Sequence, residues 1–214
     1  MKALSKALSQ RQQAEKQERI ERIMNAGRKV FLKKGYLSST IRDIALEAEL
    51  SPGLIYFYFK GKDEIYGRIC KEAFHILLGY LKEAAKTAGD AFERAEAIAY
   101  AYIDFYTSHN NYFDIISFKD MGFKKVGVSE KLQKELDNLS FDTLSIFNDS
   151  VTDLIKERNI QTDADSWKLT FALWGFIEGS LFIHKRGYFD IFDLNLKDVI
   201  ELQLQIIKEG TGRK

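Results

Sequence analysis

The chain has 214 residues, of which 45% are hydrophobic and 13% aromatic, with a single proline and a single cysteine. This length allows either one domain with a large core or a small domain joined to a larger one, and the scarcity of proline favours a predominantly helical protein. The lone Cys70 excludes an internal disulfide framework and is typical of a small core side chain. Because the first residues are charged and the longest apolar run covers only residues 169–177, we expect no signal peptide, no membrane span and a cytoplasmic protein.

The formal net charge of +1 conceals an uneven distribution along the chain. Residues 1–62 hold 13 Lys and Arg against 6 Asp and Glu, whereas residues 63–214 hold 19 against 25. A basic end of this kind indicates a polyanionic partner, either nucleic acid or an anionic membrane surface. The charge count alone leaves both partners open.

Three helix signals follow one another in the basic end of the chain. Apolar residues recur at helical spacing over residues 20–34, and Gly35 stands where such a helix is expected to end. Thr40 is expected to cap a second helix of about two turns, with Asp43 completing a weak capping box. Ser51 is expected to cap a third helix, with the only proline of the chain at its first position. Short helices joined by so tight a turn cross steeply, as in a helix-turn-helix.

The third helix carries four consecutive aromatic residues in the stretch LSPGLIYFYFKGK, residues 50–62. Ile55 and Phe59 lie four residues apart and therefore share one face of the helix. We expect this face to join Phe31 and Ile44 in a small core.

The other aromatic residues of this helix need a different environment. We expect Phe57 to pack against the helix that follows. Tyr56 and Tyr58 each offer a flat ring and a hydroxyl that can bond a phosphate oxygen or a base edge, so we expect them to face a ligand. Gly53 and the start of the helix add backbone N–H groups and a favourable dipole for an anion.

Long helices are predicted for the rest of the chain at residues 63–88, 91–106, 129–156, 163–186 and 194–208. The helix at 91–106 is apolar on nearly every side, which is typical of the middle of a bundle. Residues 110–128 are irregular and aromatic, and we expect a short helix and a loop there. The pattern predicts an all-α fold, with a three-helix helix-turn-helix domain at residues 1–62 and a helical domain at residues 63–214.

Residues 26–66, AGRKVFLKKGYLSSTIRDIALEAELSPGLIYFYFKGKDEIY, closely resemble the DNA-binding domain of the TetR/AcrR family of transcriptional repressors. The resemblance combines many features in order, among them the Thr-Ile-Arg-Asp-Ile-Ala run, the Leu-Ser-Pro-Gly turn and the Tyr-Phe-Lys that closes the third helix. It covers about a fifth of the chain. It implies that the helix beginning at Ser51 enters the major groove of operator DNA.

The resemblance also implies a set of DNA-binding residues. These are Thr40, Arg42, Ser51, Gly53, Leu54, Tyr56, Tyr58 and Lys62. Arg42 is either a base contact, pairing with guanine through its guanidinium, or a phosphate contact. Gly53 and Leu54 lie at the leading end of the helix, where base shape or a thymine methyl can be read.

The family further implies a homodimer and a C-terminal domain that binds a small-molecule effector. We expect the last two helices to build the dimer interface, since residues 167–182 carry an apolar stripe. The candidate pocket residues, which indicate a mainly apolar ligand, are Tyr102, Phe105, Phe118, Phe141 and Trp174. Aromatic residues at helical spacing more often belong to a core. Glu178 is expected to pair with a polar or cationic group of the ligand or with a basic residue across the dimer.

These features predict a dimeric, sequence-specific transcriptional regulator, a repressor that a small, mainly apolar ligand releases from operator DNA. The alternative is a helical protein that binds anionic membranes or polyanions through its basic end. An enzyme is not expected, because His75, His109 and His184 lack metal-ligand spacing and the chain has no Gly-rich phosphate loop or nucleophile motif. We therefore expect no catalytic residue, no metal, no cofactor and no membrane partner.

Overall fold

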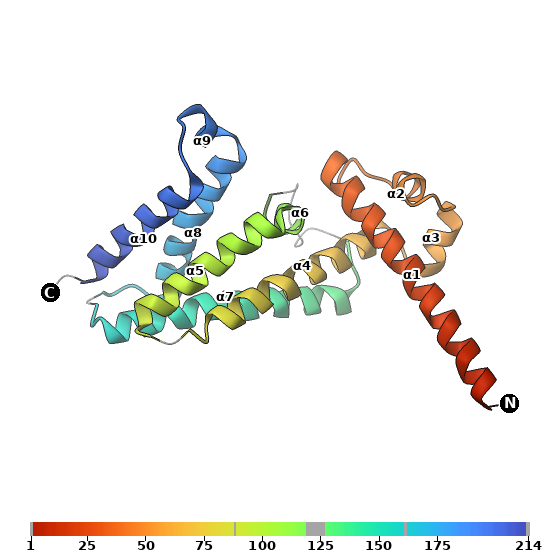
Figure 1. The fold of residues 1–214 in the computed structure, drawn as a ribbon, viewed down its shortest axis with the longest axis horizontal. Coiled ribbons are helices and arrows are strands. Elements are labelled where there is room, and N and C mark those ends of the chain that lie inside the picture. Colours follow the sequence, from red (N-terminus) through yellow and green to blue (C-terminus); the bar gives the residue numbers. More distant parts are fainter. Residues whose placement is uncertain (1, 88, 119–126, 161, 213–214) are drawn as a thin grey trace. The chain divides into compact units, whose positions relative to one another are not determined.

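The computed structural model describes residues 2–87, 89–118, 127–160 and 162–212, which form helices and turns with no strand among them (Figure 1). The first half contains α1 (Lys2–Lys34), α2 (Ile41–Ala48), α3 (Pro52–Tyr58), α4 (Lys62–Ala84) and α5 (Ala91–Ser108). The second half contains α6 (Asn110–Phe113), the π-helix η1 (Asp114–Phe118), α7 (Glu130–Glu157), α8 (Ser166–Lys185), α9 (Tyr188–Ile191) and α10 (Leu196–Gly212). The predicted all-α fold is confirmed.

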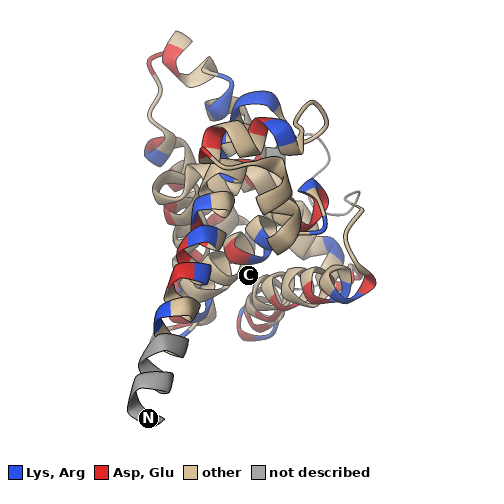
Figure 2. Cartoon of the chain, turned by 90° about the vertical axis from the view of Figure 1, so that its right-hand side faces the viewer, with Lys and Arg blue, Asp and Glu red and all other residues tan. Residues whose placement is uncertain are grey.

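The first helix is longer than its apolar pattern predicts, because α1 begins at Lys2 rather than near Ile20. Residues 2–19 are mostly Ala, Leu, Lys, Gln, Glu and Arg, which are good helix formers. Extending an existing helix needs no new nucleus, so these residues continue α1. Residues 10–19 are exposed, and basic and acidic residues alternate along the described part of this helix (Figure 2).

The chain divides into two compact units. Unit 1 comprises Met1–Ile76 and Tyr106–Ser140, and unit 2 comprises Leu77–Phe105 and Phe141–Lys214. Helices α4, α5 and α7 each contribute residues to both units. Unit 1 therefore holds the helix-turn-helix together with a segment from much later in the sequence, which the expected boundary after residue 62 does not include. The boundary between a DNA-binding domain and an effector-binding and dimerisation domain after residue 62 stays a prediction.

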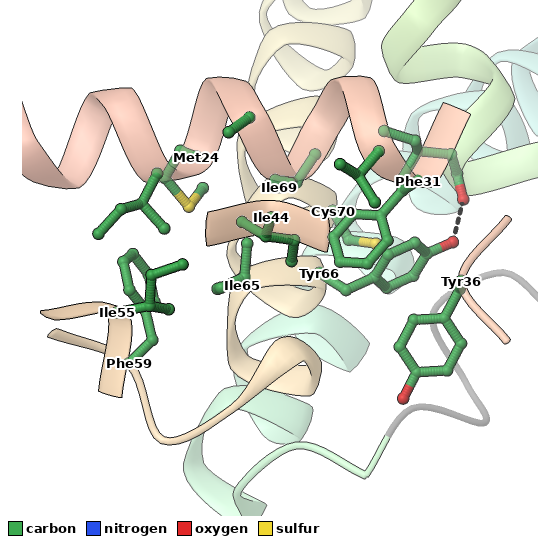
Figure 3. Packing of buried hydrophobic residues seen from close by; sticks show 14 of the residues in the cluster. Met24, Phe31, Tyr36, Ile44, Ile55, Phe59, Ile65, Tyr66, Ile69 and Cys70 are labelled. Carbon is green, nitrogen blue, oxygen red and sulfur yellow. Dashed lines mark hydrogen bonds between the residues drawn. The ribbon is translucent and has the colours of Figure 1, made fainter. Parts of the chain in front are cut away.

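The hydrophobic core of unit 1 joins residues of the first four helices (Figure 3). Phe31, Ile44, Ile55 and Phe59 are all buried in it, as their helical spacing predicts. Tyr66 of α4 meets the Phe31 ring edge-on, with 5.1 Å between the ring centroids. The crossing of α2 and α3 is thus fixed by apolar side chains that point away from the outer surface of α3.

The later segment of unit 1 completes this core. The fully buried Tyr66 donates its hydroxyl hydrogen bond to the carbonyl oxygen of Ile115 in η1, at 2.8 Å, and Ile115 is itself fully buried. Arg28 of α1 lies over the ring of Tyr112 in α6, 4.6 Å from its centroid. Cys70 is buried in the same cluster, which raises the pKa of its thiol and confirms its prediction as a core side chain.

In unit 2, α8 packs against α10. The side-chain amide of Gln203 donates to the carbonyl oxygen of Phe176 at 2.9 Å and to the Ser180 hydroxyl at 2.8 Å. These buried bonds fix the two helices against each other, since a buried amide that loses its partners costs stability. Among the described residues, no helix combines the length and the apolar character needed to cross a bilayer.

Candidate DNA-binding surface and ligand cavity

The cap of α2 uses the hydroxyl of Thr40 and the carboxylate of Asp43. The Asp43 backbone N–H donates to Thr40 Oγ1 at 3.2 Å, and the Thr40 backbone N–H donates to Asp43 Oδ2 at 2.9 Å. Hydrogen bonds from Lys34 and Thr40 hold the pKa of the Asp43 carboxyl below its usual value. The capping box that the sequence predicts is confirmed, and Thr40 remains exposed at the start of α2.

The turn between α2 and α3 is formed by Glu49, Leu50 and Ser51. Glu49 adopts a left-handed conformation with φ of 52°, and its backbone N–H donates to the carbonyl oxygens of Ala45 and Leu46 in α2. Ser51 Oγ accepts a hydrogen bond from the backbone N–H of Leu54 at 3.2 Å, which confirms the predicted cap of α3. The sequence therefore folds locally into the tight turn that presents α3 on the surface.

The outer face of α3 is aromatic. Tyr56 is 59% exposed and Phe57 is 77% exposed, whereas Tyr58 is half-buried against the core of unit 1. The expectation that Phe57 packs against the next helix is wrong. Only one face of a seven-residue helix can reach the core, and Ile55 occupies it, so Phe57 points outward. Its ring forms a T-shaped pair with the Tyr58 ring, with 5.0 Å between the centroids.

A shallow hollow lies between the start of α2, α3 and the turn before α4. Of the expected DNA-binding residues, it brings together Thr40, Arg42, Tyr56 and Lys62. Arg42 is exposed and has no ion pair or side-chain hydrogen bond among the described residues. Lys60 also lines the hollow with an exposed side chain, and the sequence reasoning missed it. Its position as the first basic residue after α3 could have indicated that Lys60 is a candidate DNA contact.

Lys62 is engaged within the protein. Its ammonium group donates to the carbonyl oxygens of Tyr36 at 2.8 Å, Leu37 at 3.3 Å and Ser39 at 2.9 Å. It also lies over the Tyr36 ring, 4.6 Å from the centroid. An ammonium has three donor hydrogens, so a phosphate contact at Lys62 would replace one of these bonds. The predicted phosphate contact stays a prediction.

Gly53 and Leu54 stand at the leading end of α3, where Gly53 is exposed and Leu54 is half-buried. A Cβ atom on Gly53 would meet only Ser51 Oγ, at 4.0 Å. Packing within the chain therefore does not require glycine at this position. The open space is consistent with close approach of another molecule to the backbone.

A cavity of about 70 Å³ lies inside unit 2, with walls from α5, α7, α8 and α10. Tyr102 and Trp174 line it, as the sequence reasoning expected. Phe105 does not line it, and its fully buried ring lies beside Tyr80. Phe141 is 60% exposed and also lies outside the cavity. The side chain of Phe118 falls outside the described part of the chain.

Glu178 pairs with Tyr102. The Tyr102 hydroxyl lies 2.5 Å from Glu178 Oε2 and donates to it. Burial raises the pKa of the Glu178 carboxyl, and the hydrogen bond from Tyr102 opposes this rise. Within unit 2 the partner of this carboxyl is the Tyr102 hydroxyl. Its expected pairing with a polar or cationic ligand group, or with a basic residue across the dimer, stays a prediction.

The sequence comparisons match the N-terminal part of the chain. Residues 23–69 match the model of the family described as bacterial regulatory proteins, tetR family. The HTH-type transcriptional regulator HbdR of Aromatoleum sp. (strain CIB) is 49% identical over 49 residues, which are 23% of this chain and 21% of HbdR. Across the curated relatives, the matched segment spans 19–40% of each relative's length.

Solved structures match most of the chain. The MbdR regulator from Azoarcus sp. CIB has a TM-score of 0.68 and 20% identity, covering 88% of this chain and 96% of MbdR. FadR from Bacillus subtilis, solved in complex with stearoyl-CoA, has a TM-score of 0.65 and 20% identity, covering 86% of this chain and 97% of FadR. At these identities the likeness shows a common fold. Residues 23–69 therefore form a helix-turn-helix domain of the tetR family of bacterial regulatory proteins, and most of the chain shares the fold of the MbdR regulator.

Proposed function

We propose that the chain is a homodimeric, sequence-specific transcriptional regulator that binds operator DNA through α2 and α3. The observation that carries this proposal is the hollow beside α3. Around it, Arg42, Tyr56 and Lys60 are exposed and have no hydrogen-bond partner for their side chains among the described residues. Free guanidinium, ammonium and phenol groups beside a helix are suited to phosphate oxygens and base edges.

The surroundings of each expected DNA-binding residue indicate which part of the DNA it contacts. Arg42 contacts guanine or a phosphate, and Tyr56 and Lys60 contact phosphates. Gly53 lets the start of α3 approach the bases, because nothing in the chain crowds it. Ser51 and Thr40 already serve as helix caps, so any phosphate contact they make adds to a structural role.

Binding to anionic membranes is less well supported, because much of the basic charge of the helix-turn-helix is paired. Three cations of α1 form ion pairs with carboxylates of α2 and of the turn after it: Arg22 with Glu49, Lys29 with Glu47 and Lys34 with Asp43. Surface pairs of this kind contribute little stability, but they reduce the charge offered to a flat anionic surface. The unpaired Arg42 and Lys60 instead cluster at one hollow.

The homodimer is supported by the apolar surface of unit 2. Large apolar side chains that are more than two fifths exposed occur on α8 at Phe171, Phe176, Phe182 and Ile183, and on α10 at Leu202 and Ile206. Gly175 and Gly179 of α8 have open space where a side chain would stand. So many exposed apolar side chains on two adjoining helices indicate an interface, and we assign it to a second copy of the chain.

The cavity of unit 2 supports an effector with an apolar part. At about 70 Å³ it holds only a short piece of a chain, so a larger ligand must displace wall side chains. A ligand that prefers the displaced arrangement shifts the protein toward it, and a coupling of about 1–3 kcal/mol lowers operator affinity about 5- to 150-fold. The stearoyl-CoA bound to FadR supports an acyl chain as the apolar part. We propose repression relieved by such a ligand.

Selection of DNA from a random duplex library by the purified protein tests this proposal. A palindromic consensus is expected, with half-sites about 34–36 Å or a multiple apart, since a dimer presents two recognition helices. The same protein is then mixed with vesicles rich in anionic lipid. Absence of any consensus, together with salt-sensitive vesicle binding, would favour the membrane alternative.

A further inference from the structure

Phe57 places a phenyl ring on the outer face of α3. Because an α-helix turns by about 100° per residue, a residue two positions from both Ile55 and Phe59 lies roughly opposite them. Ile55 and Phe59 are buried in the core of unit 1 (Figure 3), whereas Phe57 is 77% exposed. The spacing that buries two side chains of α3 therefore leaves most of the Phe57 ring uncovered.

The exposed ring is supported from one side and open on another. It forms a T-shaped pair with the Tyr58 ring, at an interplanar angle of 86°, and Tyr58 itself packs against the core of unit 1. Gly53 stands one turn earlier on the same face of α3, where it carries no side chain and only Ser51 Oγ lies near. A supported ring loses little conformational freedom when it is covered, and the glycine leaves room for a second molecule beside it.

The charge around the ring favours a polyanion as that second molecule. Residues 50–62 contain two lysines and no Asp or Glu. Arg42 and Lys60 are exposed, and neither side chain has a partner among the described residues. A DNA duplex that offers its phosphates to these cations brings its base edges toward the outer face of α3. DNA therefore fits both the charge and the exposed face.

A phenyl ring selects among the groups that a duplex presents. It can neither donate a hydrogen bond to a phosphate nor pair with the polar atoms of a base edge. In the major groove, the 5-methyl group of thymine is the apolar group that distinguishes one base from the other three. Contact between this methyl group and the ring removes apolar surface of both from water, which is favourable.

We propose that Phe57 contacts the methyl group of a thymine at one position in each half-site, so that Phe57 determines part of the operator sequence. The assignment rests on the proposed binding of DNA through α3. It adds the residue that reads this base and the group on the base that is read.

Replacement of thymine by uracil in the selected duplex tests the assignment, because it removes the methyl group and keeps the base pair. Each thymine of the half-site is replaced in turn, in both half-sites at once, and the full-length protein is titrated at one fixed salt concentration. Burial of one methyl group corresponds to about 4-fold in affinity, so the wild type is expected to lose about 15-fold at one position of a palindrome. Phe57→Ala is expected to bind the thymine and uracil duplexes within about 2-fold of each other at that position.

Two further variants separate the ring from its surroundings. Phe57→Leu keeps an apolar side chain and is expected to keep at least about 4-fold preference for thymine at the same position. Tyr56→Phe is the matched control, since it changes the neighbouring exposed aromatic residue by one hydroxyl. It is expected to weaken binding to all the duplexes alike and to leave the uracil effect at about 15-fold.

The assignment is overturned if the consensus half-site has no thymine, if uracil replaces every thymine without loss, or if the loss persists in Phe57→Ala. A loss in Phe57→Ala that is equal for the thymine and uracil duplexes, with the wild type showing no uracil effect, would give Phe57 a contact other than the methyl group. Failure of the library to yield any consensus would instead refute the proposed function itself, so the two failures are distinguishable.

Discussion

Lys62→Met separates a structural role of this lysine from a role in DNA binding. The substitution keeps a long apolar stem and removes three hydrogen bonds to the carbonyls of Tyr36, Leu37 and Ser39, as well as the contact with the Tyr36 ring. A hydrogen bond to a charged group contributes about 1.5–3 kcal/mol. Because Lys62 is only half-buried, water replaces part of the loss, and we expect the free energy of unfolding to fall by about 2–3 kcal/mol in total.

Urea unfolding measures this loss, and operator titration at several salt concentrations measures the DNA contacts. At a temperature where it is folded, Lys62→Met is expected to keep the wild-type salt slope. Lys60→Met is the matched control, because the exposed Lys60 side chain has no partner among the described residues. It is expected to change stability by less than about 0.5 kcal/mol and to reduce the salt slope of the dimer by about 1.8, for two lost phosphate contacts. If Lys62→Met is as stable as the wild type and reduces the salt slope, the structural role is refuted.

Three further predictions concern stability. Tyr66→Phe leaves the buried carbonyl of Ile115 without its donor and is expected to lower the free energy of unfolding by about 1–3 kcal/mol in urea; an unchanged midpoint would mean that η1 is not held by this bond. Ser51→Ala removes the cap of α3 and is expected to cost about 1 kcal/mol, whereas Ser38→Ala, in a neighbouring exposed turn, is expected to cost much less. Since the pKa of Glu178 is raised in the folded protein, the stability it contributes is present below its ordinary pKa near 4.5 and is lost as pH rises through the folded value. Glu178→Gln is therefore expected to gain stability relative to the wild type as pH rises from about 4.5 in thermal unfolding, and a constant difference across pH would contradict the raised pKa.

Local features of the helix-turn-helix were predictable from the sequence. The caps by Thr40 and Ser51 depend on residues within three positions of each other, and the burial of Ile55 and Phe59 follows from their spacing of four. Such signals depend on residues within one turn of helix, so they do not depend on contacts with distant parts of the chain. For the same reason, the family resemblance lies in the helix-turn-helix, and the family model matches residues 23–69, which include it.

Features that depend on distant contacts were not predictable. No local pattern shows that Lys62 binds carbonyls more than 20 residues away, or that Ile115 completes the core of unit 1. Aromatic residues at helical spacing gave no basis for separating a cavity wall such as Trp174 from the buried Phe105 or the exposed Phe141. Spacing identifies the face of a helix, but only the packing of several helices decides whether that face meets a core, a cavity or the surface.

The central claim is that the exposed basic and aromatic groups around α3 bind operator DNA, and one titration tests this claim most directly. The duplex selected from the random library is titrated beside its scrambled version with the wild type and with Arg42→Ala, at one fixed salt concentration. The account predicts at least about 10³-fold preference by the wild type for the selected duplex, and a loss of at least about 5-fold in affinity for it with Arg42→Ala at unchanged stability. Equal, weak binding of both duplexes by the wild type, with no effect of Arg42→Ala, would contradict sequence-specific recognition through this surface.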